Sequence, residues 1–173
     1  MSIPIVETER LILRGWREGD LANFSKFQMN KQAAHFVRPS ESVPEAWRLM
    51  AYFAGHWALR GYGNWSLERK DTGEHIGRCG LYYPMEWPEP EIGWCIYSEH
   101  QRKGFAAEAA RASLNYAYKK LGWTTAISLI AKDNAPSIAL ATKLGAKLEG
   151  SFVIRNTPCN IYRHLTPSQF LTH

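Results

Sequence analysis

Apolar and polar positions follow two periods along this chain, one of about 3.6 residues and one of 2, which indicates helices interleaved with strands. The segment "LILRGW" at residues 11–16 is typical of a first strand. Asp20 can then cap a short helix over residues 21–28. A longer helix is predicted between Ser42, which can cap it, and Gly61, which can end it. Its apolar residues recur at helical spacing: Trp47, Met50, Phe53 and Trp57.

The middle of the chain changes to strands. "NWSLERK" and "HIGRCGLYY" flank a turn at residues 71–73, which predicts a hairpin. "EIGWCIYSE" at residues 91–99 is a further strand. A helix rich in alanine follows and runs to Leu121, and residues 124–131, "TTAISLIA", form a β-branched strand. Residues 91–131 therefore read as a strand, helix and parallel strand unit.

The end of the chain repeats this alternation. A helix is predicted near residues 135–144, capped by Asp133 or Asn134 and closed by Gly145. Two last strands are predicted near residues 147–155 and 160–165. No internal repeat or linker stands out, so we expect a single domain over residues 1–173.

The charge is distributed unevenly. The net charge is +5, but residues 1–100 hold 11 Lys/Arg against 13 Asp/Glu, whereas residues 101–173 hold 10 against 3. An anion is therefore expected to bind the C-terminal part. No block of five like charges occurs, so we expect no nucleic-acid partner. The longest apolar runs are strand-sized and no signal segment is visible, so we expect no membrane partner.

The cysteines indicate the redox environment of the protein. Cys79, Cys95 and Cys159 are odd in number and widely separated, which favours a reducing compartment, the cytoplasm, over a disulfide framework. No Cys or His spacing typical of a metal site occurs, so no metal is expected.

The segment at residues 101–106, "QRKGFA", carries the first chemical signal. It lies between a strand and a helix, and the first backbone N–H groups of a helix have no internal partner and attract anions. Gly104 lets a ligand approach the backbone, and Arg102 and Lys103 add positive charge. This predicts a cradle for a pyrophosphate. The sequence matches neither a Walker A loop nor a dinucleotide fingerprint.

Gln101-x-x-Gly104-x-Ala106 resembles the Gln/Arg-x-x-Gly-x-Gly/Ala signature of the GNAT superfamily of acyl-CoA-dependent N-acyltransferases. "ETERLILR" and "EIGWCIY" are similar to the first and fourth strands of its branch of Rim-type ribosomal-protein N-terminal acetyltransferases. "DNAPSIALATKLGAKLEG" is similar to that branch's Asn-x-x-Ser helix and the following turn. The likeness covers nearly the whole chain.

The resemblance implies an α/β (α+β) fold, a mixed, mostly antiparallel sheet of about seven strands flanked by about four helices. Its fourth and fifth strands form a splayed parallel pair that holds acetyl-CoA, the acyl donor. Asn134 would reach the pantetheine arm. Backbone groups would pair with the pantetheine amides at Trp94, Cys95, Ile96 and Tyr97. The pyrophosphate would lie on Gln101, Arg102, Lys103, Gly104, Phe105, Ala106 and Ala107.

The resemblance also implies two catalytic residues. Glu91 matches a family glutamate and would help to deprotonate the amine, while a strand amide near Cys95 would stabilise the oxyanion. Many members use a tyrosine in the last helix to assist the leaving thiolate. Here that position is Ala141, and Ser137 is the substitute that the Rim-type branch suggests. The alternatives are structural: Glu91 as an exposed strand-end carboxylate, and Ser137 or Asn134 as helix caps.

The acceptor is expected under the first helices and the "YYPMEWPEPE" loop, in the half of the chain that is net negative and so suits a cationic amine. An N-terminal peptide amine is the first choice, and a small amine, amino acid or drug is the alternative. A CoA-binding sensor without catalysis remains a rival. The chain would act as a monomer or homodimer.

Overall fold

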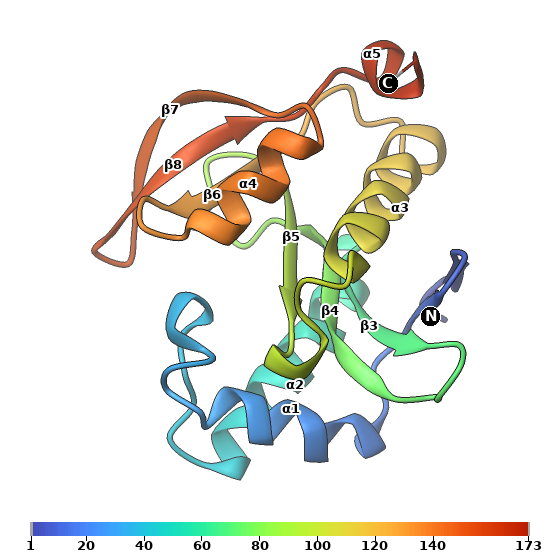
Figure 1. Ribbon diagram of the computed structural model, residues 1–173, viewed down its shortest axis with the longest axis vertical. Coiled ribbons are helices and arrows are strands. Elements are labelled where there is room, and N and C mark those ends of the chain that lie inside the picture. Colours follow the sequence, from blue (N-terminus) through green and yellow to red (C-terminus); the bar gives the residue numbers. More distant parts are fainter. Residues whose placement is uncertain (1, 173) are drawn as a thin grey trace.

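The computed structural model describes residues 2–172. Within them, eight strands form one mixed sheet in the order β1-β2-β3-β4-β5-β6-β8-β7, with five α-helices packed around it (Figure 1). The strands are β1 (Val6–Glu7), β2 (Leu11–Arg14), β3 (Asn64–Arg69), β4 (His75–Tyr82), β5 (Glu91–Ile96), β6 (Ile127–Ala131), β7 (Lys147–Ile154) and β8 (Thr157–Arg163). The helices are α1 (Leu21–Gln28), α2 (Val43–Arg60), α3 (Phe105–Lys120), α4 (Ala135–Lys143) and α5 (Pro167–Thr172). Short 3-10 turns lie at η1 (Glu18–Asp20), η2 (His35–Val37) and η3 (Ser98–His100).

One strand pair departs from the antiparallel pattern of the sheet. β5 and β6 are parallel and share a single paired position, Glu91 with Ile127, closed by the hydrogen bond from Ile127 N to Pro90 O at 3.1 Å. Beyond this point the two strands diverge, and Figure 1 shows the gap between them. The sheet therefore has two parts, β1–β5 and β6–β8–β7, joined at the start of β5.

Helices cover both parts. α3 packs against β4 and β5, and α4 packs against β6. Three fully buried alanines of α3, Ala109, Ala110 and Ala117, allow the helix to approach the sheet closely. Helices α1 and α2 pack on each other, and their side chains Phe24 and Phe53 form a second apolar cluster.

The expected fold is confirmed as a mixed, mostly antiparallel sheet with a splayed parallel pair. About seven strands and four helices were expected, and residues 2–172 contain eight strands and five α-helices. The two-residue strand β1 and the short C-terminal helix α5 have too weak a sequence pattern to be predicted. The added β1 makes the splayed strands the fifth and sixth.

The predicted caps can now be checked. Ser42 accepts from Glu45 N at 3.3 Å, and Gly61 ends α2 in a left-handed conformation, as predicted. Asp20 is a correction, because its side chain does not cap α1. It instead accepts hydrogen bonds from both Arg14 Nη atoms, at 2.8 and 2.9 Å, and from Ser66 Oγ at 3.0 Å. A buried guanidinium needs a carboxylate partner, and here that need prevails over capping.

No helix within residues 2–172 has the length and apolar character that crossing a membrane requires.

Candidate active site

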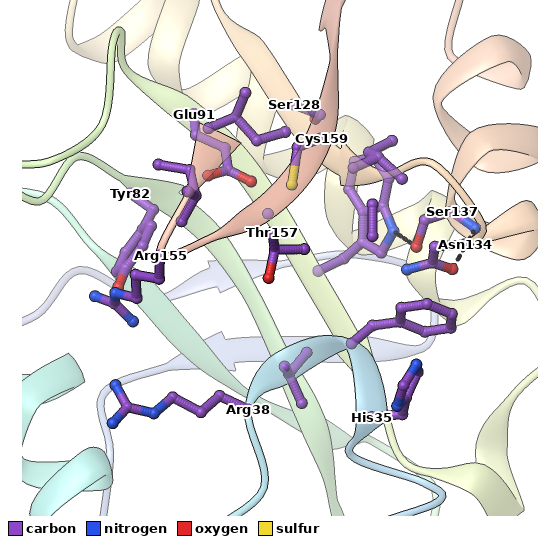
Figure 2. Close-up of a pocket in the computed structure, with 18 of the residues that line it drawn as sticks. His35, Arg38, Tyr82, Glu91, Ser128, Asn134, Ser137, Arg155, Thr157 and Cys159 are labelled. Atoms are coloured by element: carbon purple, nitrogen blue, oxygen red, sulfur yellow. Dashed lines mark hydrogen bonds between the residues drawn. The ribbon is translucent and has the colours of Figure 1, made fainter. Parts of the chain in front are cut away.

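A cavity of about 1320 Å³ lies where β5 and β6 separate. Figure 2 shows Glu91 and Tyr82 toward one side of it, Ser137 and Asn134 toward the other, and Cys159 between them. Its walls come from η2 and the residues after it, from α2, β4, β5, β6 and the start of α4, and from the hairpin between β7 and β8. Segments far apart in the sequence thus enclose a single space.

Glu91 is the buried acid of this cavity. It begins β5 at the single β5–β6 pairing position, and only 8% of its surface is exposed. Its Oε2 accepts a short hydrogen bond from Trp87 Nε1. Burial raises the pKa of Glu91 from 4.5 to about 7, although the Trp87 bond, a backbone hydrogen bond with Leu129 and the charge of Arg78 oppose the rise. Glu91 is therefore not the exposed strand-end carboxylate of the structural alternative.

The sheet leaves room beside this carboxylate. Glu91 pairs with Tyr82, and the next pair on the same face is Gly93 with Gly80, which brings no side chain. A Cβ on Gly93 would lie 3.6 Å from Glu91 Oε1. The absence of a side chain at Gly93 leaves space next to the acid, whereas a Cβ at Gly80 would meet Gly63 O at 2.5 Å.

The backbone N–H and C=O groups of successive β5 residues point alternately toward β4 and toward the gap between β5 and β6. Tyr97 N donates to Ile76 O at 2.9 Å, so Tyr97, and by alternation Cys95, point toward β4. Ile92 and Ile96 point the other way, because Ile92 O accepts from Ser128 Oγ at 2.6 Å and Ile96 O accepts from the Gln101 side chain at 2.8 Å.

This alternation corrects the expected set of four pantetheine-pairing residues. The backbone N–H of Tyr97 is used inside the sheet, and the register assigns that of Cys95 to β4 as well. The β5 amides that face the gap are those of Trp94 and Ile96. Of the backbone N–H groups next to Cys95, that of Trp94 is the nearest one that faces the gap.

Trp94 also connects the two sides of the gap through its side chain. The indole packs against the apolar clusters of both sheet parts, and its Nε1 donates to Ser137 Oγ at 3.2 Å. Because the Ser137 oxygen is the acceptor here, its own hydrogen remains free to be donated. Ser137 lies on α4 and lines the cavity.

The cap of α4 is Asn134. Its Oδ1 accepts from Ser137 N at 3.3 Å, so Asn134 is the cap and the Ser137 hydroxyl is not. Both residues line the cavity, and within residues 2–172 no acceptor lies in hydrogen-bond distance of the Asn134 Nδ2 group. Ala141 is fully buried against Ile130 and Tyr162, so its position offers no room for a phenol.

The predicted anion cradle is an exposed loop at the start of α3. Arg102 and Gly104 have positive φ values of 60° and 85°, and the helix begins at Phe105 with no side-chain cap. Gln101 anchors the loop to Ile96 O, and Lys103 Nζ donates to Glu99 O at 2.8 Å. The side chains of Gln101 and Lys103 thus hold the loop, and the positive φ values are typical of a backbone anion nest.

The structure brings together some of the predicted residues and separates others. Glu91, Trp94, Asn134 and Ser137 line one cavity. Residues 101–107 lie outside its walls, at the start of α3 beyond the C-terminal end of β5.

Sequence reasoning missed several residues around Glu91. Trp87 lies only four positions before Glu91 in the chain, a spacing that offered a signal. Ser128 and Cys159 are brought in by the pairing of β6 with β8, for which the sequence gives no local sign. The missed cavity residues are Arg78, Tyr82, Trp87, Ser128 and Cys159.

Comparisons with known proteins agree with this geometry. The family model described as an acetyltransferase (GNAT) domain matches residues 10–147. An uncharacterised N-acetyltransferase of Bacillus subtilis, YoaA, is 31% identical over 96% of this chain and 99% of its own length. The crystal structure of an acetyltransferase from Agrobacterium tumefaciens is 30% identical, with a TM-score of 0.85 over 95% of this chain and 96% of that chain.

A more distant structure shares the fold. RimJ of Mycobacterium smegmatis, solved with CoA-disulfide, is 16% identical, with a TM-score of 0.74 over 92% of this chain and 83% of that chain. The family model covers the cradle loop, both strands of the splayed pair and the cap of α4. The chain therefore belongs to the GNAT family of acyl-CoA-dependent N-acetyltransferases.

Proposed function

We propose that this protein transfers an acetyl group from acetyl-CoA to the N-terminal amine of a peptide or protein, by direct attack in a ternary complex. The observation that carries the proposal is Glu91, a buried carboxylic acid with a pKa of about 7 at the point where β5 and β6 separate. One cavity holds Glu91 as the base, Trp94 with its backbone N–H as a donor, and the hydroxyl of Ser137.

The first step removes a proton from the amine. An N-terminal amine has a pKa of about 8 and a lysine amine about 10.4, so most of it is protonated near neutral pH. A base works best when its pKa lies near the operating pH, which the raised pKa of Glu91 satisfies. Glu91 takes the proton, directly or through one water.

The second step exchanges bonds at the thioester carbon. The amine nitrogen forms a bond to the carbonyl carbon, and the negative charge passes to the carbonyl oxygen. The carbon–sulfur bond then breaks, and the extra proton of the attacking nitrogen passes, directly or through water, to the departing sulfur, so the products are the amide and CoA thiol. The Trp94 N–H that faces the gap stabilises the oxyanion. The Ser137 hydroxyl, which keeps its own hydrogen, donates to the sulfur as charge builds there.

A cysteine-bound acetyl intermediate is not part of the proposal. Burial raises the pKa of the Cys95 and Cys159 thiols, and the charge of Glu91 adds to the rise at Cys159. A nucleophilic cysteine needs a lowered pKa. Direct transfer therefore suits this cavity better than transfer in two stages.

The acyl donor has a binding surface of its own. The exposed, positive-φ loop at residues 101–104 and the first turn of α3 would hold the pyrophosphate. The gap-facing backbone of Trp94 and Ile96, with the Asn134 amide, would hold the pantetheine arm. When bound, acetyl-CoA supplies the activated acetyl group.

The exposed residues on the cavity wall favour a peptide over a small amine. The cavity measures about 1320 Å³, but the pantetheine arm would occupy part of it, so its volume alone does not size the acceptor. Phe36, Arg38 and Arg48 are exposed on the wall, where a peptide could extend beyond its first residue. The fold alone does not select the acceptor, since pocket loops differ within a fold.

A substrate screen tests this function. CoA release is followed with acetyl-CoA and four acceptors: a peptide library with free N-termini, the same peptides blocked at the N-terminus, polyamines and amine drugs. We expect turnover with free N-termini and none with the blocked set, with mass spectrometry locating the acetyl group on the α-amine. Preference for a small amine would replace the peptide acceptor. Binding of acetyl-CoA without turnover of any amine would indicate a sensor.

A further inference from the structure

The acceptor side of the cavity is rich in arginine. The negative balance of residues 1–100 led us to expect mainly acidic side chains on the acceptor side, whereas basic side chains outnumber acidic ones on the cavity wall. The basic side chains on the cavity wall are Arg38, Arg48, Arg78, Lys132 and Arg155, against the acidic side chains of Glu45, Glu91 and Asp133. The carboxylates of the N-terminal half lie mostly elsewhere, paired on the protein surface.

Some of these charges are already satisfied. Arg155 pairs with Glu86, and Glu45 accepts a hydrogen bond from Glu41 N at 2.8 Å. Within residues 2–172, the other four cavity cations, Arg38, Arg48, Arg78 and Lys132, have no carboxylate in ion-pair distance. Of these four, Arg38 and Arg48 are exposed, whereas Arg78 is partly buried on the sheet face that carries Glu91.

Arg78 is held rigidly in the cavity wall. It lies on β4, it is partly buried, and its Nη1 donates to Asn64 Oδ1 at 2.7 Å. Its guanidinium also stacks over the Phe53 ring, 4.4 Å from the centroid. A guanidinium fixed in this way loses little freedom on binding an anion and retains N–H groups for a two-point contact.

Arg78 faces the same space as the base. It pairs with Cys95 in the sheet, four register positions from the pair of Tyr82 with Glu91 and therefore on the same face, and its charge lowers the pKa of Glu91. The intervening pair, Gly80 and Gly93, has no side chains to separate them. An acceptor with its amine at Glu91 would therefore present its next functional group to Arg78.

We infer that the acceptor carries a carboxylate close to its reacting amine and that Arg78 binds this carboxylate. The inference rests on the acetyl transfer of the proposed function and narrows its acceptor to amines that carry a nearby carboxylate. A free amino acid as that acceptor would replace the peptide. A second cation beside Arg78 would be repelled, so a polyamine is disfavoured. Pairing also offsets the cost of a partly buried guanidinium that forms no ion pair within the described residues.

The phosphates of CoA do not account for this charge. Arg78 stacks on α2, on the face of the sheet that also carries Cys95 and the apolar cluster of α1 and α2. The cradle loop lies at the start of α3, which packs against the same strands through a different cluster containing Phe105 and Ala109. The arginines near α2 are thus on the acceptor side.

Two sources could supply the carboxylate: the α-carboxylate of a free amino acid, or an acidic side chain at the start of a peptide. Two matched pairs separate these sources. Alanine is compared with alaninamide, and C-terminally amidated peptides that begin with Asp or Glu are compared with those that begin with Asn or Gln. The ratio of kcat/KM within each pair cancels general effects on catalysis.

We expect one of the two carboxylate acceptors to exceed its neutral partner by about tenfold or more, since a hydrogen bond to a charged group contributes about 1.5–3 kcal/mol. Arg78→Gln should reduce that ratio to near one, and Arg78→Lys should leave an intermediate ratio. Arg17→Gln, which removes an equal charge from a side chain outside the cavity, should keep the wild-type ratio. Melting temperatures show whether each variant is folded, and Arg78→Lys serves if Arg78→Gln is not.

Two results would overturn the inference: neutral partners used as well as the carboxylates by the wild type, or an unchanged ratio in a folded Arg78 variant. A binding arm separates this failure from failure of the proposed function. N-acetylated forms of the same acidic and amide compounds are titrated into the CoA-bound protein. If no acceptor is turned over but binding still selects the carboxylate forms and depends on Arg78, only the catalytic function is contradicted. If the acidic and amide forms bind equally well, the role of Arg78 is overturned.

Discussion

Trp87 donates its indole hydrogen to Glu91, four residues further along the chain. The donor comes from the loop between β4 and β5, and the acceptor begins β5. This bond favours the ionised carboxylate, whereas burial favours the neutral acid. The balance leaves the pKa of Glu91 at about 7, where a base for amine deprotonation is effective.

Replacing Trp87 should therefore move the pH dependence of the reaction. Trp87→Phe keeps a ring but removes the donor, so the pKa of Glu91 should rise above 7. Because the base acts when ionised, the acidic limb of kcat/KM should move upward by about one pH unit. A pH–rate profile at saturating acetyl-CoA measures this. Trp123→Phe, outside the cavity, is the matched control and should leave the limb in place. A midpoint equal to wild type in Trp87→Phe would exclude the tuning role.

Glu91 should also destabilise the folded protein at alkaline pH. The folded state holds the Glu91 proton up to about pH 7, whereas the unfolded state loses it near 4.5, so the stability contributed by this group is present below 4.5 and falls as pH rises to 7. Glu91→Gln removes this penalty, which is on the order of 3 kcal/mol. Denaturant unfolding at about pH 4 and about pH 8 should show that the free energy of unfolding of the variant, relative to wild type, is larger at the higher pH. Turnover of the variant should fall. An equal difference at both pH values would contradict the raised pKa.

Much of the fold was predictable because local signals agree with it. The boundaries of α1 match the predicted residues 21–28, and Ser42 and Gly61 delimit α2 as expected. These positions depend on caps and periodicity, which are properties of short segments. Asp20 departs from its predicted capping role because Arg14, which lies in a different element and is buried next to it, needs its charge.

The candidate site was predictable only where a motif marks it. Glu91 and Ser137 were found through family segments, whereas Arg78 enters the cavity through the register of β4 and β5. That register also determines which β5 amides face the gap, and a single sequence does not define it. The acidic balance of residues 1–100 did not predict the mostly basic cavity wall for the same reason, since net charge along a chain does not define which side chains face a pocket.

Gly104 should be essential for binding acetyl-CoA. Its φ of 85° favours glycine, and a Cβ there would lie 3.2 Å from Arg10 Nη2. Gly104→Val should displace the loop and weaken acetyl-CoA binding by about tenfold or more, as expected for loss of a charge-assisted hydrogen bond. Isothermal titration measures the change.

Gly122 provides the control for this substitution. It follows the other end of α3 with a φ of 69°, so Gly122→Val imposes a comparable backbone cost of about 1–3 kcal/mol without touching the loop. Gly122→Val should lower the melting temperature and keep acetyl-CoA affinity. If both variants bind as tightly as wild type, the start of α3 is not the pyrophosphate site.

Ser137 allows a separation of catalysis from stability. Asn134 caps α4 through the backbone N–H of Ser137, so Ser137→Ala leaves the cap intact and removes only the hydroxyl and its contact with Trp94. If the hydroxyl donates to the leaving sulfur, turnover should fall several-fold, since one neutral hydrogen bond contributes about 1 kcal/mol. Acetyl-CoA affinity should change less, because the bond strengthens as charge builds on sulfur.

Asn134→Ala is the complementary variant for this test. It removes the cap while keeping the Ser137 hydroxyl, so it should lower the melting temperature more than Ser137→Ala does. Turnover and melting temperature are measured on the same preparations at saturating acetyl-CoA. A Ser137→Ala protein with wild-type turnover would remove the hydroxyl from the mechanism. The thiolate would then leave unassisted, as its pKa of about 8.5 permits.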